Sequence, residues 1–501
     1  MSKVRVRFAP SPTGYLHIGS LRTALYNFLF AKKEKGDFLL RIEDTDQKRF
    51  VEGAEENLLN TLKWAGINWD NKEIIKQSGR LEIYKKYADQ LVKEGKAYYC
   101  FCAPERLEEM RAEQTAQKKP PIYDRHCLNL SEEEIKKNLE NKAPFVIRMK
   151  IPRGETLEFN DLIRGKVSFK TDLVDDQVII KSDGFPTYHL ASVVDDQEME
   201  ITHVIRGEEW LPSAPKHLLL YKYFGWEAPE FSHLPLLLNS DKSKLSKRQG
   251  DVAVEDYIKQ GYLKEAIINF VALLGWNPGE GSTQEIFSLE ELIQKFDLSH
   301  VHKAGAVFDV KKLDWMNSQW IKKINLDDLY SRALEFLEKK DFYINTSEEK
   351  KSEEYIKKFL TVERERLEKL SEVGESNKFF FQDINYDKEL LRWKDMDDEN
   401  IRKSLETAKM RIENLSTDFF EIEKSLDMPF GYNQTQIDST LMMSIDDEKF
   451  KKENGKPDLG KILWPVRVAL TGEQKSPSPT QCAWVLGQKE SLKRIGQALK
   501  K

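Results

Sequence analysis

The architecture of the front of the chain is set by one stretch, Val4-Arg5-Val6-Arg7-Phe8-Ala9-Pro10-Ser11-Pro12-Thr13-Gly14-Tyr15-Leu16-His17-Ile18-Gly19-Ser20. Its first apolar residues alternate with arginines, which is the period-two pattern of a strand. Two prolines and Gly14 then end that strand, because proline lacks a ladder donor and glycine allows a tight turn. We therefore expect a strand over residues 4–8, followed by a turn.

The residues after this turn predict a helix and a second strand. Apolar side chains between Leu21 and Leu29 recur at the spacing of one helix face, and Gly36 is expected to end the helix. Residues 38–42 read as a strand, and Glu43-Asp44-Thr45-Asp46 lies just beyond its end. Strand, helix and strand form a βαβ unit, whose ligand crevice lies at the carboxyl ends of its strands.

The composition sets limits on the class of protein. The chain has 501 residues, 40% of them hydrophobic and 33% charged, and a net charge of −5. This balance excludes a grossly basic nucleic-acid coat, although a local basic surface remains compatible with it. No apolar run approaches the ~20 residues of a membrane helix, and residues 1–7 lack the apolar core of a signal peptide. Four cysteines fit a reducing compartment, so we expect a cytoplasmic protein without a membrane partner.

The rear of the chain has a different pattern. From about residue 320 it is charged and amphipathic, with few strand signals. Ile356, Phe359, Leu360, Leu367 and Leu370 are expected to form one apolar helix stripe. The fold class is therefore α/β at the front and mostly helical at the rear.

Two segments suggest phosphate chemistry. Residues 14–20 run into the expected helix, whose N-terminal amides and dipole suit an anion. Gly19 would let a nucleotide approach the backbone, and His17 could donate to a phosphoryl oxygen; the alternative is a capped helix with an incidental histidine. The other segment, residues 241–250, has four basic side chains between 242 and 248 and no acid among them. It could close on a polyphosphate, or it could be an ordinary exposed basic loop.

These motifs resemble a known family. His17-Ile18-Gly19-Ser20 and Lys244-Leu245-Ser246-Lys247-Arg248 resemble the HIGH and KMSKS motifs of class I aminoacyl-tRNA synthetases. Four further segments resemble the bacterial-type glutamyl-tRNA synthetases, namely residues 7–14, 41–46, 204–210 and 462–472. Ser20, Leu245 and Arg248 depart from the class consensus in ways that the glutamyl branch commonly tolerates.

The resemblance implies a fold and an activity. The expected fold is a Rossmann-like parallel-sheet catalytic domain, split by an α+β insert and followed by a mostly α-helical C-terminal region. The expected boundaries are 1–97 and 187–250 for the catalytic halves, 98–186 for an acceptor-end-binding insert, 251–325 for a stem-contact domain and 326–501 for an anticodon-binding domain. The expected reaction joins L-glutamate to the 3′-terminal adenosine of tRNA(Glu) through a glutamyl-adenylate formed with ATP.

The resemblance also implies roles for single residues. It assigns catalysis to His17, Lys244 and Lys247, and ATP binding to His17, Gly19 and Lys247, with Mg²⁺ arriving on ATP. It assigns glutamate binding to Arg7, Ser11, Glu43, Tyr188 and Arg206. Arg7 would grip the γ-carboxylate, because a guanidinium fork matches two carboxylate oxygens, and Glu43 would face the α-ammonium group.

Three cysteines leave a metal question open. Cys100, Cys102 and Cys127 could hold Zn²⁺ with one further ligand, as some family members do. The position where zinc-binding members have histidine is Asn129, and His126 or Tyr123 could substitute for it. The alternative is a set of ordinary thiols.

Charge and the same motif residues also bear on the nucleic-acid partner and on the alternative functions. Residues 1–49 carry ten basic and five acidic side chains, which suits a tRNA partner. Charging of tRNA(Glu) alone and charging of tRNA(Gln) as well both stay open, and a monomer is expected. The helical rear disfavours a glutaminyl-tRNA synthetase and a truncated tRNA-modifying relative, whereas His17, Lys244 and Lys247 disfavour a catalytically inactive paralogue.

Overall fold

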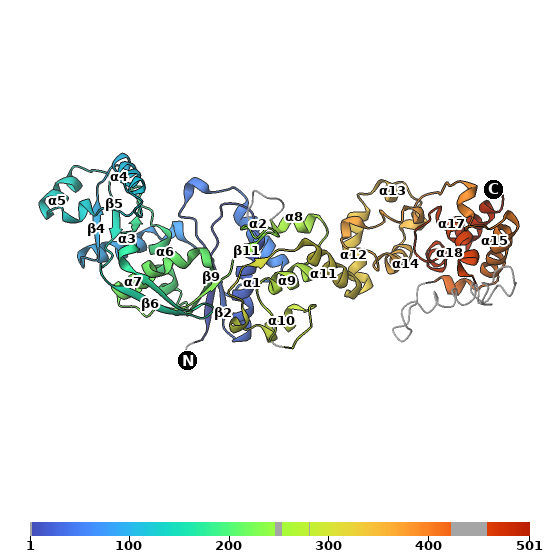
Figure 1. Cartoon of the computed structure of the whole chain (residues 1–501), viewed down its shortest axis with the longest axis horizontal. Coiled ribbons are helices and arrows are strands. Elements are labelled where there is room, and N and C mark those ends of the chain that lie inside the picture. The colour runs from blue at the N-terminus through green and yellow to red at the C-terminus, as the bar shows by residue number, and fades with distance from the viewer. Residues whose placement is uncertain (1–2, 246–252, 280, 422–457) are drawn as a thin grey trace. The chain divides into compact units, whose positions relative to one another are not determined.

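The computed structural model of the chain describes residues 3–245, 253–279, 281–421 and 458–501. It divides into two compact units. The first unit consists of Met1–Ile258 and Lys264–Leu313, and the second of Lys259–Leu263 and Asp314–Lys501. Every strand labelled in Figure 1 belongs to the first unit, whereas the labels of the second unit are all helices.

The secondary structure of the first unit mixes strands and helices. Its strands are β1 Arg5–Phe8, β2 Asp37–Ile42, β3 Ile75–Lys76, β4 Ala97–Cys100, β5 Val146–Met149, β6 Thr156–Asp161, β7 Gly165–Lys170, β8 Val178–Ile180, β9 His203–Gly207, β10 Glu230–Leu234, β11 Leu237–Leu238 and β12 Ala306–Val307. Its helices are α1 Ile18–Lys33, α2 Ala54–Trp64, α3 Leu81–Lys93, α4 Pro104–Ala116, α5 Glu132–Glu140, α6 Tyr188–Glu198, α7 Ala214–Phe224, α9 Lys264–Leu273 and α10 Leu289–Lys295. Two helices, α8 Val254–Lys259 and α11 Val310–Lys323, contain a boundary between the units.

The predicted βαβ unit is confirmed. Strands β1 and β2 are parallel with Arg5 opposite Asp37 and Arg7 opposite Leu39, and β3 extends the sheet beyond β2. Helix α1 connects β1 to β2, and its buried face includes Leu21 and Leu25. The carboxyl ends of β1 and β2 therefore meet at one edge of the sheet, as the pattern predicted.

The expected role of Gly36 is wrong in detail. Helix α1 ends at Lys33, and Lys35 rather than Gly36 takes the left-handed conformation, with φ of 52°. Gly36 lies so close to β1 that a Cβ there would overlap the carbonyl oxygen of Val4. Glycine is needed here for close backbone approach and not as the left-handed cap.

A second sheet has the order β7-β6-β10-β9. Strand β9 lies beside β1, because the N–H of Thr202 donates to the carbonyl of Arg5 at 2.9 Å. Strands β9 and β10 are parallel. The carboxyl end of β9 lies with those of β1 and β2, because Arg7, Glu43 and Arg206 line one cavity. Strands β6 and β7 lie within the sequence range expected for the insert, yet they belong to the sheet that contains β9 and β10.

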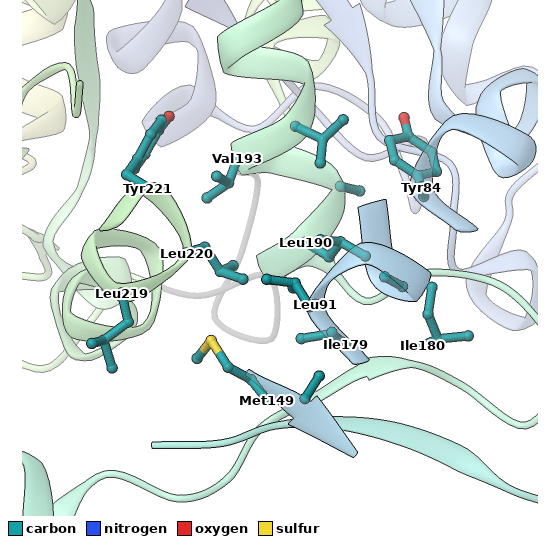
Figure 2. Packing of buried hydrophobic residues seen from close by; sticks show 14 of the residues in the cluster. Tyr84, Leu91, Met149, Ile179, Ile180, Leu190, Val193, Leu219, Leu220 and Tyr221 are labelled. Atoms are coloured by element: carbon teal, nitrogen blue, oxygen red, sulfur yellow. The ribbon is translucent and has the colours of Figure 1, made fainter. Parts of the chain in front are cut away.

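A hydrophobic core fixes the helices that face the sheets. Its members come mainly from α3, β5, β8, α6 and α7, and Figure 2 shows Leu91, Leu190 and Leu220 converging at its centre. All three are fully buried, and burying such a side chain contributes about 1.5–3 kcal/mol. The core thereby sets the position of α6, whose first and last turns reach the site described below.

The second unit is helical over the residues that the structure describes. Its helices are α12 Leu326–Leu337, α13 Asp341–Ile344, α14 Glu353–Glu363, α15 Asp398–Glu413, α17 Leu459–Thr471 and α18 Pro479–Ala498. The five-residue apolar stripe is corrected, because α14 ends at Glu363 and Leu367 and Leu370 lie beyond it. All five side chains are nevertheless buried. No helix within the described ranges has the length and hydropathy to cross a bilayer.

Candidate active site

A cavity of about 940 Å³ lies at the carboxyl ends of β1, β2 and β9. Its lining combines the turn before α1, the segment after β2, the start of α6 and the segment after β9. It includes every residue before the basic loop that was predicted to bind glutamate or ATP, namely Arg7, Ser11, His17, Gly19, Glu43, Tyr188 and Arg206. Segments up to two hundred residues apart in sequence thus supply one site.

His17 caps the helix that begins at this cavity. Its Nδ1 accepts a hydrogen bond from the backbone N–H of Gly19 at 2.9 Å. A neutral imidazole that accepts at Nδ1 has its proton on Nε2, so this ring is set to donate from Nε2. The first-turn amides and the dipole of α1 add to the attraction for an anion.

Arg7 is buried and its guanidinium is held from one side. Its Nε donates to Oδ1 of Asp196 at 3.0 Å and its Nη2 donates to Oδ2 at 3.4 Å. These contacts leave Nη1 without a protein partner among the described residues. Burial alone would raise the pKa of Asp196, but the charges of Arg7 and Arg41 outweigh it and hold that pKa below its ordinary value.

Arg41 connects the two acidic groups of the site. It is completely buried, and it donates from Nη1 to Asp196 at 2.8 Å and from Nη2 to Glu43 at 2.9 Å. Glu43 is itself buried, and burial raises its pKa against the opposing effect of Arg41. The predicted residues Arg7 and Glu43 are therefore ends of one continuous ionic network through Asp196 and Arg41.

Asp195 forms the deeper layer of this network. It accepts from Gln77 Nε2 at 2.8 Å, from Arg80 Nε at 2.9 Å and from the Tyr84 hydroxyl at 2.9 Å. Nε of Arg41 lies 3.7 Å from it. The sequence reasoning missed Asp195 and Asp196, and the one available signal was a pair of adjacent acids within the apolar run of α6.

Arg206, at the end of β9, also lines the cavity and is also buried. Its Nε donates to His233 Nε2 at 3.1 Å, and its Nη1 contacts the Tyr188 hydroxyl at 3.0 Å and His217 Nδ1 at 3.2 Å. Its Nη2 donates to the Trp210 carbonyl at 3.4 Å. Tyr188 also packs on Trp210 with ring centroids 4.3 Å apart, so an aromatic wall adjoins the guanidinium.

The basic loop is described only at its two flanks. Lys244 is exposed and does not line the cavity, whereas Lys247 and Arg248 lie outside the described residues. On one flank, the N–H of Leu245 donates to Leu237 in β11 at 2.9 Å. On the other, the N–H of Val254 donates to Leu16 at 2.9 Å, beside the turn of His17.

The three cysteines lie together as a group in the insert. Their sulfur atoms are all within 4.8 Å of one another, and Sγ of Cys102 is 3.5 Å from Sγ of Cys127. The Tyr123 hydroxyl lies 3.4 Å from Cys100 and 3.3 Å from Cys102. Tetrahedral zinc with thiolate and oxygen ligands places its ligand atoms roughly 3.5–3.8 Å apart, so this donor set fits the ion.

Comparison with protein families covers nearly the whole chain. Residues 3–315 match the family described as tRNA synthetases class I (E and Q), catalytic domain. Residues 328–427 and 442–499 match a family described as an anticodon binding domain. The first match alone spans more than half of the chain.

Individual proteins show the same similarity end to end. The glutamate–tRNA ligase of Chlorobium phaeobacteroides is 47% identical over 515 residues, covering 99% of this chain and 98% of that protein. That of Clostridioides difficile is 45% identical, covering 98% of both. A crystal structure of a glutamate tRNA ligase from Elizabethkingia meningosepticum CCUG26117, in complex with its amino acid, superposes with a TM-score of 0.84 at 37% identity over 100% of both chains. The resemblance seen in the sequence motifs is confirmed, and the chain belongs to the glutamate–tRNA ligase family of class I tRNA synthetases.

Proposed function

We propose that this protein joins L-glutamate to the 3′-terminal adenosine of tRNA(Glu) through a glutamyl-adenylate. The observation that supports this most directly is the composition of one cavity, whose lining includes two buried guanidinium groups, a buried carboxylate and a histidine-capped helix start. A dicarboxylic amino acid needs the first two features, and a nucleotide phosphate needs the third.

In the first step an oxygen of the substrate α-carboxylate attacks the α-phosphorus of ATP. The bond from that phosphorus to the bridging oxygen breaks, and pyrophosphate leaves. In the second step a terminal hydroxyl of the tRNA attacks the acyl carbon, and AMP leaves. Positioning and charge stabilisation supply most of the catalysis in such a displacement.

The site residues divide the substrates between them in this proposal. Arg7 pairs with the γ-carboxylate through its remaining Nη1 donor, with Ser11 at the rim, and Glu43 faces the ammonium group. Tyr188 and Arg206 complete the glutamate site.

The nucleotide side of the cavity is assigned in the same way. His17 donates from Nε2 to a phosphate oxygen, and Gly19 admits the nucleotide to the start of α1. Lys244 and Lys247 are assigned to stabilise the departing pyrophosphate. Mg²⁺ arrives with ATP and neutralises phosphate charge.

The experiment that tests this function is aminoacylation of purified tRNA(Glu) and tRNA(Gln) with labelled glutamate and with labelled glutamine. We expect glutamate to be attached to tRNA(Glu) and glutamine to neither tRNA. Attachment of glutamate to tRNA(Gln) would place this enzyme among those that charge both acceptors. Absence of glutamate-dependent and tRNA-dependent ATP–pyrophosphate exchange would contradict the proposal.

We propose that each predicted domain binds a different part of the tRNA. Residues 98–186 take the acceptor end, 251–325 contact the stem and 326–501 bind the anticodon. The enzyme would act as a cytoplasmic monomer, and its four free cysteines fit a reducing compartment.

We propose one structural Zn²⁺ held by Cys100, Cys102, Cys127 and the Tyr123 oxygen. Two arginines lie near this set, with Arg106 Nη1 3.5 Å from the sulfur of Cys102 and the Arg148 guanidinium 4.1 Å from the Tyr123 ring centroid, so positive charge favours thiolates. When bound, the ion would brace the insert and take no part in the reaction.

Metal analysis of the purified full chain tests the zinc proposal. We expect about one zinc per chain, lost in Cys102→Ser and kept in the control Cys482→Ser, which changes a buried thiol of the second unit. A wild-type content under ~0.2 zinc per chain would leave the cluster as ordinary thiols.

A further inference from the structure

No carboxylate of the described residues contacts the guanidinium of Arg206 directly. Its contacts are two imidazoles, a phenol and a carbonyl, and it forms no ion pair with any residue that the structure describes. A guanidinium has five N–H donors, so these four contacts leave one N–H of Nη2 for a ligand. Burying a cation without a counter-ion is costly, and a site that tolerates it is built to receive an anion.

Arg7, the other buried arginine of the cavity lining, is in a different state. Its Nε and Nη2 face the carboxylate of Asp196, which Arg41 shares. In that network carboxylates contact the guanidinium groups directly, whereas the Asp161 carboxylate reaches Arg206 only through His233. The two buried guanidinium groups that line the cavity are therefore not equivalent: Arg206 lacks the direct carboxylate partner that Arg7 has.

Because arginine can only donate hydrogen bonds, it determines which ring nitrogen carries the proton in each histidine that it contacts. Because Arg206 donates to His233 Nε2, the proton of that neutral ring is on Nδ1, which faces Oδ2 of Asp161 at 2.6 Å. By the same rule, His217 accepts at Nδ1 and donates from Nε2 to His189 Nδ1, 3.2 Å away. The result is one ordered chain of hydrogen bonds from Asp161 to His189 through Arg206.

Each end of this chain is itself anchored. Oδ1 of Asp161 accepts from the N–H groups of Ile163 at 3.0 Å and Arg164 at 2.9 Å. At the other end, burial lowers the pKa of His189 to about 3, and burial together with the charge of Arg206 lowers the pKa of His217 well below its ordinary value. Both rings are consequently neutral at pH 7 and can accept and donate as described.

We propose that His233 and His217 are positioning residues that hold Arg206 by neutral acceptors, so that its full charge meets the carboxylate of the glutamate substrate. A carboxylate at either position would hold the guanidinium equally well but would neutralise it. Glutamine would leave this cation unbalanced, so the same arrangement disfavours the amide. This inference rests on the proposed function, in which Arg206 belongs to the glutamate site.

The two histidines face Arg206 with different ring atoms, which gives a sharp test. The amide oxygen of asparagine can occupy the place of Nδ1, and that of glutamine the place of Nε2. His233→Gln and His217→Asn should therefore keep the acceptor, whereas His233→Asn and His217→Gln should lose it. His203→Asn and His203→Gln serve as controls, because His203 lies on the same strand as Arg206 and bonds to Thr202 instead.

The measurement is the KM for glutamate and for ATP in tRNA-dependent pyrophosphate exchange, with the thermal midpoint of each full-length variant. We expect His233→Asn and His217→Gln to raise the glutamate KM about tenfold or more, with the ATP KM within about twofold. The glutamate KM of the variants that keep the acceptor, His233→Gln and His217→Asn, should stay near the wild-type value. Should one position not tolerate substitution, the pair at the other tests the same rule.

The outcome separates the two proposals. The positioning role would be overturned by equal effects of asparagine and glutamine at both positions, or by an ATP KM that rises as much as the glutamate KM. In either case an impaired glutamate KM in Arg206→Lys would still support Arg206 as part of the glutamate site. A glutamate KM unchanged in Arg206→Lys would instead remove Arg206 from the site, and the inference with it.

Discussion

Arg41 donates from Nη2 to Oε1 of Glu43 across 2.9 Å, and the two residues stand two positions apart at the end of β2. Alternate residues of an extended segment point to one face, so this local spacing brings the pair together. From the same position Arg41 reaches Asp196 on α6. Arg41 thus orients both groups that are proposed to bind the charged ends of glutamate: Glu43 directly, and Arg7 through Asp196.

The first prediction concerns this arginine. Arg41→Met should lower the free energy of unfolding by about 3–5 kcal/mol, because it leaves Glu43 and Asp196 buried without a shared cation. Urea unfolding of the full chain measures this. Arg5→Met is the matched control on the neighbouring strand, where partly exposed ion pairs to Asp37 and Glu200 should contribute at most about 1 kcal/mol. Equal losses in the two variants would contradict the role given to Arg41.

The second prediction concerns Arg7. Arg7→Ala should reduce activation with glutamate by about 100-fold or more, because the γ-carboxylate loses a buried charged donor. The ATP KM should change little, since the nucleotide lies against the turn of His17. Steady-state pyrophosphate exchange with either substrate varied separates the two effects. If both the glutamate KM and turnover stay near wild type, Arg7 does not hold the substrate.

The third prediction separates the two nitrogens of His17. Asparagine can accept from Gly19 as Nδ1 does, but it cannot donate from the place of Nε2. His17→Asn should keep the thermal midpoint while turnover falls about 10²–10³-fold, which is typical for loss of one transition-state donor. His17→Ala should lose the cap as well, at about 1 kcal/mol of stability. Near-normal turnover in His17→Asn would show that the ring serves only as a helix cap.

Local pattern predicted the parts of the fold that depend on neighbours in sequence. The strand at residues 4–8, helix α1 and the acidic end of β2 follow from side-chain periodicity alone, and they place Arg7, His17 and Glu43 at one sheet edge. Gly36 shows the limit of this reasoning, because its requirement comes from contact with β1 and not from the helix end.

The partners of the site residues could not be predicted in the same way. Asp196 reaches Arg7 and Arg41 only because α6 packs into the core of Figure 2, and His233 reaches Arg206 only because β10 lies beside β9. Neither contact leaves a local signature, since both join residues far apart in sequence. The family resemblance identified Arg206 as a site residue, but only the structure shows which side chains hold it.

The last prediction follows from the buried neutral histidines. Burial lowers the pKa of His189 to about 3 and keeps its ring uncharged in the folded chain, whereas the unfolded chain binds a proton below about pH 6.5. Below about pH 6.5 the unfolded state therefore binds more protons than the folded state. The free energy of unfolding then falls by about 1.4 kcal/mol per pH unit for each such histidine. The urea midpoint should fall between pH 7.5 and 5.5, and less steeply in His189→Asn, which keeps an acceptor for His217 and cannot titrate. A wild-type slope in His189→Asn would mean that His189 is protonated in the folded enzyme.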